Sequence, residues 1–358
     1  MGVYADVKPY DSPGSSAVYA PDEVLWRQRY DYLLERGYQL RPRYDPRWKP
    51  SWLNTGKPRI LCEDDVMSND GHILDATRMN DKSRVSIKVI SRKSSEHKIS
   101  RHLSSEALSR NPNNHCVPVH DVFQDCINPE QVLLIMTYLR PFDDPPFAFV
   151  DEVMDFVRQS LEGLCFLHDQ GVAHRDCFTA NIMMDGRPLF PEDHHPVLTS
   201  QTPDVSRDAT HLKRLQHPVK YYYVDFGLST HFKDGEPPYV LGTKGADQSA
   251  PELSDETPYN AFMLDVYVLG HVYESDLLQV YPELRFLRPL VSAMMQRQPE
   301  RRPTAEVALR MFHDIRRTSK EYADIGGRRA ISPDPSPTKQ VVNALSSTFQ
   351  AWTGIKLT

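Results

Sequence analysis

The 358-residue chain has few of the features that mark membrane, secreted or nucleic-acid-binding proteins. No apolar run approaches the roughly 18 residues of a membrane span, and no charged-then-apolar leader opens the chain. The five cysteines are scattered, odd in number and without a Cys-x-x-Cys pair, which argues against a disulfide framework or a zinc site. The net charge of −6 gives no global basic field for nucleic acid or anionic membranes. These absences predict a soluble cytoplasmic or nuclear protein that binds neither nucleic acid nor membrane.

Prolines, by contrast, are in excess. The 29 prolines gather near both ends of the chain and in residues 185–219. Proline lacks a backbone donor and restrains the residue before it, so these stretches are expected to be largely irregular. We expect an N-terminal extension over 1–57, an insertion over 185–219 and a tail over 319–358. Four histidines in the insertion suggest a metal, but without His-x3-His spacing or a nearby cysteine a surface loop is favoured. The remaining composition is that of an ordinary globular protein with room for two lobes.

The N-terminal extension contains two patterns. A helix is predicted from Asp22, because this residue can cap it and because apolar residues from Trp26 to Leu33 share one face. Residues 41–50 hold three prolines and cannot form a regular helix, so we expect an extended strap whose tryptophans anchor it on the next domain. A proline-rich ligand for a partner protein is the alternative interpretation of this stretch.

The pattern then becomes strand-like. Three β-rich runs near residues 60–66, 72–78 and 84–90 are separated by Ser-Asn-Asp-Gly and Asn-Asp-Lys-Ser, both good hairpin turns. An antiparallel meander is therefore predicted. Its third strand places Lys88 among β-branched residues, where a lone lysine is usually only solvated.

Later segments change from strands to helices. A serine-capped helix is predicted over 94–103 and two further strands over 117–123 and 131–138. From Val150 to Leu167, apolar residues recur at spacings of three and four, which predicts a long buried helix. Strands first and helices second indicate a two-lobed α+β protein with a hinge near residues 137–145.

Residues 174–181, His-Arg-Asp-Cys-Phe-Thr-Ala-Asn, follow that helix after a glycine that can end it. A loop at this place can hold Asp176 near a hydroxyl group and turn Asn181 towards a cation. An ordinary charged loop is the alternative, so the motif needs support elsewhere in the chain.

That support comes from five other motifs, which occur in the order of the protein kinase signature set. They are Val-Ser-Ile-Lys ending at Lys88, Asp-Phe-Gly from Asp225, Ala-Pro-Glu ending at Glu252, an apolar segment from Asp265, and Arg302. Six matches in one order make coincidence negligible. The chain resembles the protein kinase superfamily over roughly residues 58–318, and its strap, the cysteine after Asp176 and the insertion resemble fungal kinase-like proteins.

The resemblance implies a two-lobed protein kinase-like fold of the α+β class. An antiparallel β N-lobe would span residues 58–138 and a mainly helical C-lobe residues 139–318. ATP and Mg²⁺ are the implied cofactors, and a protein of unknown identity is the implied substrate. The oligomeric state stays open.

Roles for individual residues also follow from the resemblance. Lys88 would hold the α- and β-phosphates of ATP and be steadied by Glu96, with Glu106 as the alternative. Asp176 would act as general base, while Asn181 and Asp225 would bind Mg²⁺. The other implied nucleotide contacts are Gly71 in the glycine-rich loop, Ala76 over the adenine, Met136 behind it, and Tyr138 and Leu139 in the hinge.

Two departures from the family pattern bear on activity. In the glycine-rich loop only Gly71 matches, and the two earlier glycine positions read Val66 and Ser68. Phe178 stands where Ser/Thr kinases carry a lysine near the γ-phosphate. Removing one such cation typically costs a few kcal/mol of barrier, or roughly a hundredfold or more in rate.

Three functions are therefore weighed. The intact Lys88, Asp176, Asn181 and Asp225 favour an active Ser/Thr-type protein kinase. The incomplete glycine loop and Phe178 favour a pseudokinase scaffold that holds nucleotide weakly without transfer. A small-molecule kinase is the third reading, and the Ala-Pro-Glu motif argues against it.

Overall fold

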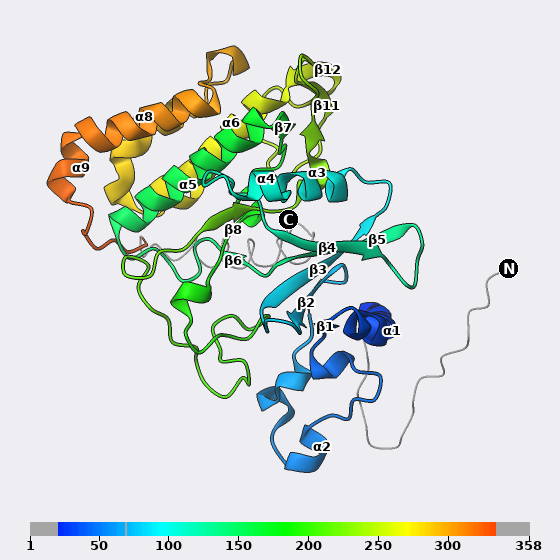
Figure 1. Ribbon diagram of the computed structural model, residues 1–358. Helices are drawn as coiled ribbons and strands as arrows, with labels where there is room; N and C mark the ends of the chain where they lie inside the picture. The colour runs from blue at the N-terminus through cyan, green and yellow to red at the C-terminus, as the bar shows by residue number, and fades with distance from the viewer. Residues whose placement is uncertain (1–20, 69, 334–358) are drawn as a thin grey trace.

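The computed structural model describes residues 21–68 and 70–333, and it confirms the predicted two-lobed α+β fold (Figure 1). The first part of the predicted extension, up to residue 20, and most of the predicted tail, from residue 334, lie outside the described residues. An antiparallel sheet forms the N-lobe, and helices dominate the C-lobe. Within the described ranges, no helix combines the length and apolar character that crossing a membrane requires.

The N-lobe sheet has the strand order β1-β2-β3-β5-β4, and every neighbouring pair is antiparallel. The later strands agree with the predicted ones. Alternation along β3 puts Val85 and Ile87 on one face and Lys88 on the other. The strands are β1 (Tyr38–Gln39), β2 (Ile73–Arg78), β3 (Arg84–Ser91), β4 (Val119–Gln124) and β5 (Gln131–Thr137).

The first predicted strand, near residues 60–66, is wrong. This stretch forms two short 3₁₀ turns, η2 (Arg59–Leu61) and η3 (Glu63–Asp65). The edge position beside β2 is taken instead by β1, where Tyr38 pairs with Arg78. A β-rich composition could not reveal this, because strand pairing depends on which segments meet in space.

Helix α1 (Pro21–Glu35) confirms the helix predicted from Asp22 and covers the outer face of the sheet. Trp26 and Leu33 are almost fully buried against side chains that include Leu74 and Val85. In Figure 1, α1 lies on the side of the sheet away from the C-lobe. Together, α1 and β1 belong to the same packed unit as the strands that follow.

The strap packs on the N-lobe through polar contacts. It contains η1 (Pro42–Tyr44) and leads into α2 (Trp52–Thr55). Trp48 donates from Nε1 to Asp64 Oδ2 at 2.8 Å, which ties the strap to η3.

The C-lobe is built around α5 (Val150–Asp169), the predicted long buried helix. Its inward residues, among them Val153, Val157 and Leu164, are fully buried. Helices α6 and α8 lie alongside it in Figure 1. The other C-lobe helices are α6 (Ala261–Val272), η7 (Tyr273–Leu278), η8 (Pro282–Leu287), α7 (Arg288–Met294), η9 (Pro299–Arg301), α8 (Ala305–Thr318) and α9 (Lys320–Ile325).

The remaining elements of the two lobes are short helices, strands and 3₁₀ turns. On the N-lobe side these are α3 (Glu96–Leu103) and α4 (Glu106–Ser109). Three small C-lobe sheets combine β6 (Arg140–Pro141) with β8 (Ile182–Met184) and β9 (Tyr221–Tyr223), β7 (Val172–Ala173) with β10 (Thr230–His231), and β11 (Tyr239–Gly242) with β12 (Ser254–Asn260). The remaining 3₁₀ turns are η4 (Thr179–Asn181), η5 (Arg187–Leu189) and η6 (Phe226–Leu228).

The insertion does not project freely into solvent. It lies beside the hinge and the η2–η3 turns, because Tyr138 bonds to Pro196 and His195 lies close to Glu63. His195 is fully buried and its Nε2 lies 3.4 Å from Glu63 Oε1. Asp193 forms an ion pair with Arg84 of β3 at 2.7 Å. In the described part of the chain, no group of three or more His, Cys, Asp and Glu side chains is placed to hold a metal ion.

Candidate active site

Lys88 lies between two carboxylates. Its Nζ donates to Glu96 Oε1 at 2.7 Å and to Asp225 Oδ1 at 2.8 Å. Glu96 opens α3 and is 4% exposed, so the short connection after β3 does bring it to the lysine. The alternative partner, Glu106, is exposed and pairs with Arg110. The structure thus brings together a cation from the N-lobe and a carboxylate from the C-lobe.

The charges of these groups stabilise one another. Burial alone would lower the pKa of Lys88, but Asp225 and Glu96 outweigh it and raise that pKa above its ordinary value. Burial alone would raise the pKa of Asp225, but the neighbouring Lys88 holds it below its ordinary value. At neutral pH, Lys88 is therefore a cation and Asp225 an anion.

The predicted catalytic loop is anchored by a buried aspartate of α6. Asp265 is fully buried and accepts backbone N–H groups from His174 at 2.8 Å and Arg175 at 2.6 Å. His168, near the end of α5, lies 3.0 Å from the same carboxylate through its Nε2. Three contacts on one buried carboxylate fix the backbone on the N-terminal side of Asp176.

Both oxygens of Asp176 are held in place. Oδ2 accepts from Asn181 Nδ2 at 2.9 Å, and Oδ1 accepts from the backbone N–H of Ala246 at 2.8 Å. Burial raises the pKa of Asp176 above its ordinary value, against the opposing effect of the Ala246 hydrogen bond. A carboxylate with a raised pKa, oriented in this way, is suited to accept a proton.

Asn181 and Asp225 come to neighbouring positions through the β8–β9 pairing. Ile182 pairs with Tyr223, and the carbonyl of Asn181 accepts from Val224 N–H at 3.0 Å. Asp225 has a left-handed backbone with φ of 58°, and its carboxylate accepts from Gly227 N–H at 3.0 Å. Asn181 uses its amide nitrogen on Asp176, which leaves the amide oxygen for a cation. Two hard oxygen donors of this kind fit Mg²⁺, which takes its remaining ligands from phosphate and water.

Met136, predicted behind the adenine, and the hinge residues Tyr138 and Leu139 lie at or directly after the end of β5. Met136 pairs with Ser86, so its buried side chain shares the face of the sheet that carries Lys88. Leu139 is also buried in the core that joins the two lobes. Tyr138 donates from its hydroxyl to the carbonyl of Pro196 in the insertion at 2.9 Å.

Ala76 does not lie where the resemblance placed it. It pairs with Val85, and its side chain is buried on the outer face among residues that include Trp26. Since side chains alternate along a strand, the residues on the face of Lys88 include Ile73 and Asp75 on β2 and Ser86 on β3. Ser86 lies two residues before Lys88 on the same predicted strand, so its place on the face of Lys88 could have been predicted from the sequence alone.

The turn that ends at Gly71 departs further from a phosphate-binding loop. The carboxylate of Asp70 accepts the N–H groups of His72 at 2.7 Å and Ile73 at 3.2 Å. Gly71 is covered by α1, because Trp26 Nε1 donates to its carbonyl at 3.1 Å. Backbone donors that could face a phosphate are thus already used by a carboxylate of the same turn.

The segment after Asp225 is held from both ends. Arg175 donates to the carbonyl of Leu241 at 2.9 Å and lies 3.3 Å from the hydroxyl oxygen of Thr230. At the other end, Arg302 and Glu252 form the buried ion pair that their motifs imply, with Arg302 NH2 donating to Oε2 at 2.8 Å. These contacts fix the segment that passes Asp176.

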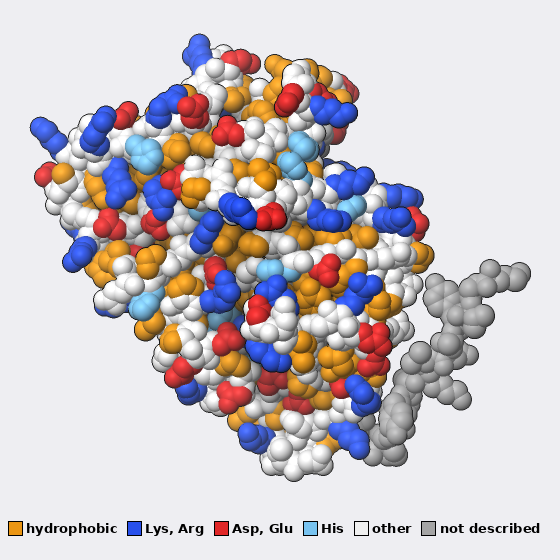
Figure 2. Space-filling view, in the orientation of Figure 1, with side chains coloured by type: hydrophobic (Ala, Val, Ile, Leu, Met, Phe, Trp, Pro, Cys, Tyr) orange, Lys and Arg blue, Asp and Glu red, His pale blue; other side chains and the backbone are white. Residues whose placement is uncertain are grey.

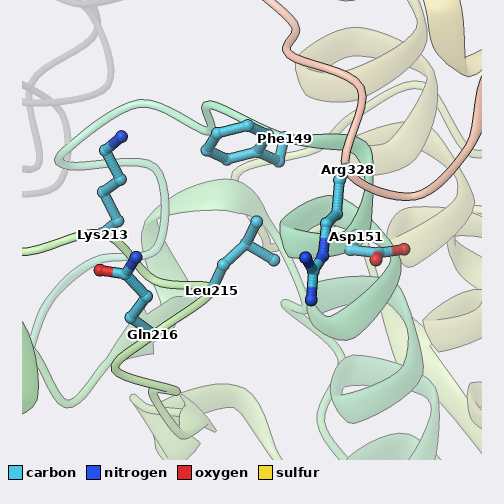
Figure 3. A pocket seen from close by; sticks show the side chains of 6 residues that line it. All are labelled: Phe149, Asp151, Lys213, Leu215, Gln216 and Arg328. Carbon is cyan, nitrogen blue, oxygen red and sulfur yellow. The ribbon is translucent and has the colours of Figure 1, made fainter.

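Two surface cavities lie away from this site. One, of about 370 Å³, lies between the start of α5, the insertion and the C-terminal segment, with Lys213, Leu215 and Arg328 in its wall (Figure 3). The other, of about 460 Å³, borders β12. None of the predicted site residues lines either one. Figure 2 shows basic and acidic side chains interspersed over one face of the molecule.

Comparisons with known proteins agree with the geometry. The chain matches the protein kinase domain family over residues 69–282, more than half of its length. Sperm motility kinase 1 of Mus musculus is 29% identical over 217 residues, which cover 53% of this chain and 37% of the relative. Protein-tyrosine kinase 6 of Mus musculus is 23% identical over 235 residues, which cover 58% and 51%.

The matched part therefore spans about a third to a half of these curated relatives. The resemblance to fungal kinase-like proteins stays a prediction, because both relatives come from mouse. The order of motifs, the two-lobed fold and the match over residues 69–282 lead to one conclusion: the chain belongs to the protein kinase family.

Proposed function

We propose that this protein transfers the γ-phosphoryl group of ATP to a serine or threonine hydroxyl group of a protein substrate. The observation that carries the proposal is the position of Lys88, in contact with both Glu96 and Asp225. This contact joins the N-lobe to the C-lobe and leaves Asp225 beside Asn181. Asp176, held by Asn181, completes the set of groups that phosphoryl transfer needs.

The reaction asks mainly for alignment and charge neutralisation. Lys88 would hold the α- and β-phosphates as a cation. Asp225 and the amide oxygen of Asn181 would hold Mg²⁺, which neutralises charge on the phosphates when bound. Asp176 would orient the acceptor hydroxyl and take its proton. The hydroxyl oxygen then bonds to the γ-phosphorus, the bond from that phosphorus to the β–γ bridging oxygen breaks, and ADP leaves.

A specific observation favours a second candidate, a pseudokinase that holds nucleotide weakly and transfers nothing. Asp70 occupies the N–H groups of its own turn and would place negative charge near the phosphates. Phe178, which packs partly against the C-lobe core, leaves the position near the γ-phosphate without a cation. Both features would reduce the stabilisation of the transition state for phosphoryl transfer while leaving the fold in place.

The test pairs nucleotide binding with transfer of labelled phosphate. Wild-type protein is expected to show a Mg²⁺-dependent thermal shift with ATP and to label a protein substrate. Asp176→Asn should bind ATP equally well but transfer roughly 10²- to 10⁴-fold more slowly, because it lacks the general base. Asp169→Asn, at the exposed end of α5, is the matched control and should behave as wild type.

Incorporation by the wild type no higher than by Asp176→Asn would contradict the kinase proposal, and a thermal shift without incorporation would support the pseudokinase. Phosphoamino-acid analysis of the labelled product checks the finer claim. Phosphotyrosine as the product would contradict the Ser/Thr class and indicate a tyrosine kinase, the class stated in the name of one mouse relative.

A further inference from the structure

We propose that Arg41, which lies before the segment that matches the family, forms part of the nucleotide site and contacts the base and sugar of the bound nucleotide. This inference rests on the proposed function, because it concerns the same site. Arg41 precedes residue 69, the start of the family match, by 28 positions (69 − 41). No motif pointed to it, and its place follows from strand register and burial.

The register of β1 puts Arg41 on the face of the sheet that carries Lys88. Gln39 pairs with Thr77, so two residues later Arg41 reaches Asp75, to which it donates from Nε at 3.1 Å. Leu40, the residue between, is buried in the outer cluster. Alternation then sends Arg41 to the opposite face, the face shared by Asp75 and Lys88.

Arg41 completes a line of side chains across this face. Met136 on β5 pairs with Ser86 on β3, Ser86 pairs with Asp75 on β2, and Asp75 bonds to Arg41. Lys88 lies two residues along β3 from this line, a distance of about 7 Å at strand spacing. Since Lys88 is the group for the α- and β-phosphates, the line that starts at Met136 and ends at Arg41 lies over the base and sugar.

One nitrogen of the Arg41 guanidinium group makes no hydrogen bond to the described residues. Its side chain is only 9% exposed, and NH1 donates to the carbonyl of Val66 at 2.8 Å and lies 3.4 Å from Glu63 Oε1. The other terminal nitrogen, NH2, is buried and has no hydrogen-bond partner among the described residues. A buried donor without an acceptor is costly, so its position indicates a missing acceptor. The ring nitrogens and ribose hydroxyls of a nucleotide are acceptors of this kind.

The chemistry of arginine suits this place. A planar guanidinium stacks on a purine ring and at the same time donates in its own plane, which an aliphatic side chain cannot do. Asp75 and Glu63 fix the plane of the group before a ligand arrives. Arg41 would thus supply binding energy for the nucleotide that the backbone of the turn around Asp70 does not supply.

The experiment measures affinity by calorimetry on the full chain, with Mg²⁺–ADP and with adenosine as separate ligands. Arg41→Leu is expected to weaken both ligands by roughly tenfold, the value of one charge-assisted hydrogen bond. The double variant Arg41→Leu/Asp75→Leu should stay equally weak, because the contact itself is lost. Arg297→Leu, an exposed arginine beyond α7, is the control and should bind as wild type.

Other results overturn the inference. Recovery of affinity in the double variant would show that Arg41 only neutralises Asp75. Tighter binding by Arg41→Leu would show that the side chain blocks the site, and unchanged binding would place it outside the site. Weakening of ADP but not adenosine would assign it to the phosphates.

Arg41→Lys keeps the charge near Asp75 and tests the planar contact should the leucine variant fail to fold, with weaker binding of both ligands expected. Failure of the proposed function can be told apart from failure of the Arg41 inference. Wild-type protein that binds no nucleotide would overturn both proposals. Wild-type protein that transfers phosphate, together with unchanged nucleotide affinity of Arg41→Leu, would overturn only the Arg41 inference.

Discussion

Single residues set the charges of the candidate active site. Lys88 and Asp225 keep their charges because each stabilises the other in a partly buried setting. Asp70 works against them, since its carboxylate accepts the backbone donors of its own turn. Under the proposed function, the site would combine the charged groups at Lys88, Asp176 and Asp225 with a weakened hold on the phosphates.

The side chain at position 178 offers the sharpest test of catalysis at this scale. Phe178 lies two residues after Asp176 and is only partly buried, so a longer side chain can reach outward. We expect Phe178→Lys to raise kcat roughly tenfold to a hundredfold, because it returns a cation to the transition state. Rates of labelled phosphate transfer measure this effect.

Phe178→Met is the matched control, since it keeps an apolar side chain of similar reach and should leave kcat near the wild-type value. A lysine variant no faster than the methionine variant, with the same melting temperature, would show that the missing cation does not limit the rate.

Among the elements, α1 ties the N-lobe together on its outer side. It covers the outer face of the sheet and also reaches the far hairpin through Arg29. Arg29 donates from Nε and NH2 to the two oxygens of Asp125, at 2.9 and 2.7 Å, and both side chains are buried. Such a two-bond pair holds the helix in one orientation on the sheet.

Breaking this pair should therefore destabilise the whole N-lobe. Arg29→Met leaves the Asp125 carboxylate buried without its partner, and we expect the free energy of unfolding to fall by about 3–5 kcal/mol. Urea unfolding followed by tryptophan fluorescence, which reports on Trp26 in α1, measures the change.

The double variant Arg29→Met/Asp125→Leu leaves no buried charge and should recover most of the loss. If the single and double variants unfold at the same urea concentration, the pair does not carry the stability assigned to it.

At the scale of the whole molecule, segments far apart in the sequence meet around the hinge. The insertion contacts Tyr138 through Pro196 and Arg84 through Asp193. The turns before β2 contact the insertion through Glu63. The hinge is therefore flanked by residues that precede the family match and by residues within 185–219.

Truncation tests how much the N-lobe depends on the packing of α1 and β1. A chain of residues 58–358 lacks α1 and β1, so the outer side chains of β2, β3 and β5 lose their cover and become an exposed apolar patch. We expect it to be insoluble or to melt far below the full chain. A chain of residues 21–358 keeps every described contact of α1 and is the reference against which this loss is measured. Equal melting temperatures for the two truncated chains would contradict the packing role of α1.

Much of the site could be predicted because its residues are defined by short spacings. Asp176 and Asn181 lie five positions apart in one loop, and the strand pattern around Lys88 is local as well. The long helix α5 follows from a period that a helix imposes on its buried face. Local spacing left two candidate partners for Lys88, Glu96 and Glu106, and the structure brings Glu96 to it because the short connection leaves α3 beside β3.

The family, the order of the motifs and the identities of the charged groups could all be predicted from the amino-acid sequence, because these depend on residue type and local spacing. Three features required the folded chain: residues 38–39 form the edge strand, Ala76 faces outward and Arg41 contacts Asp75. These features depend on which segments pack together. Packing energy is summed over many weak contacts between distant residues, and no short spacing records it.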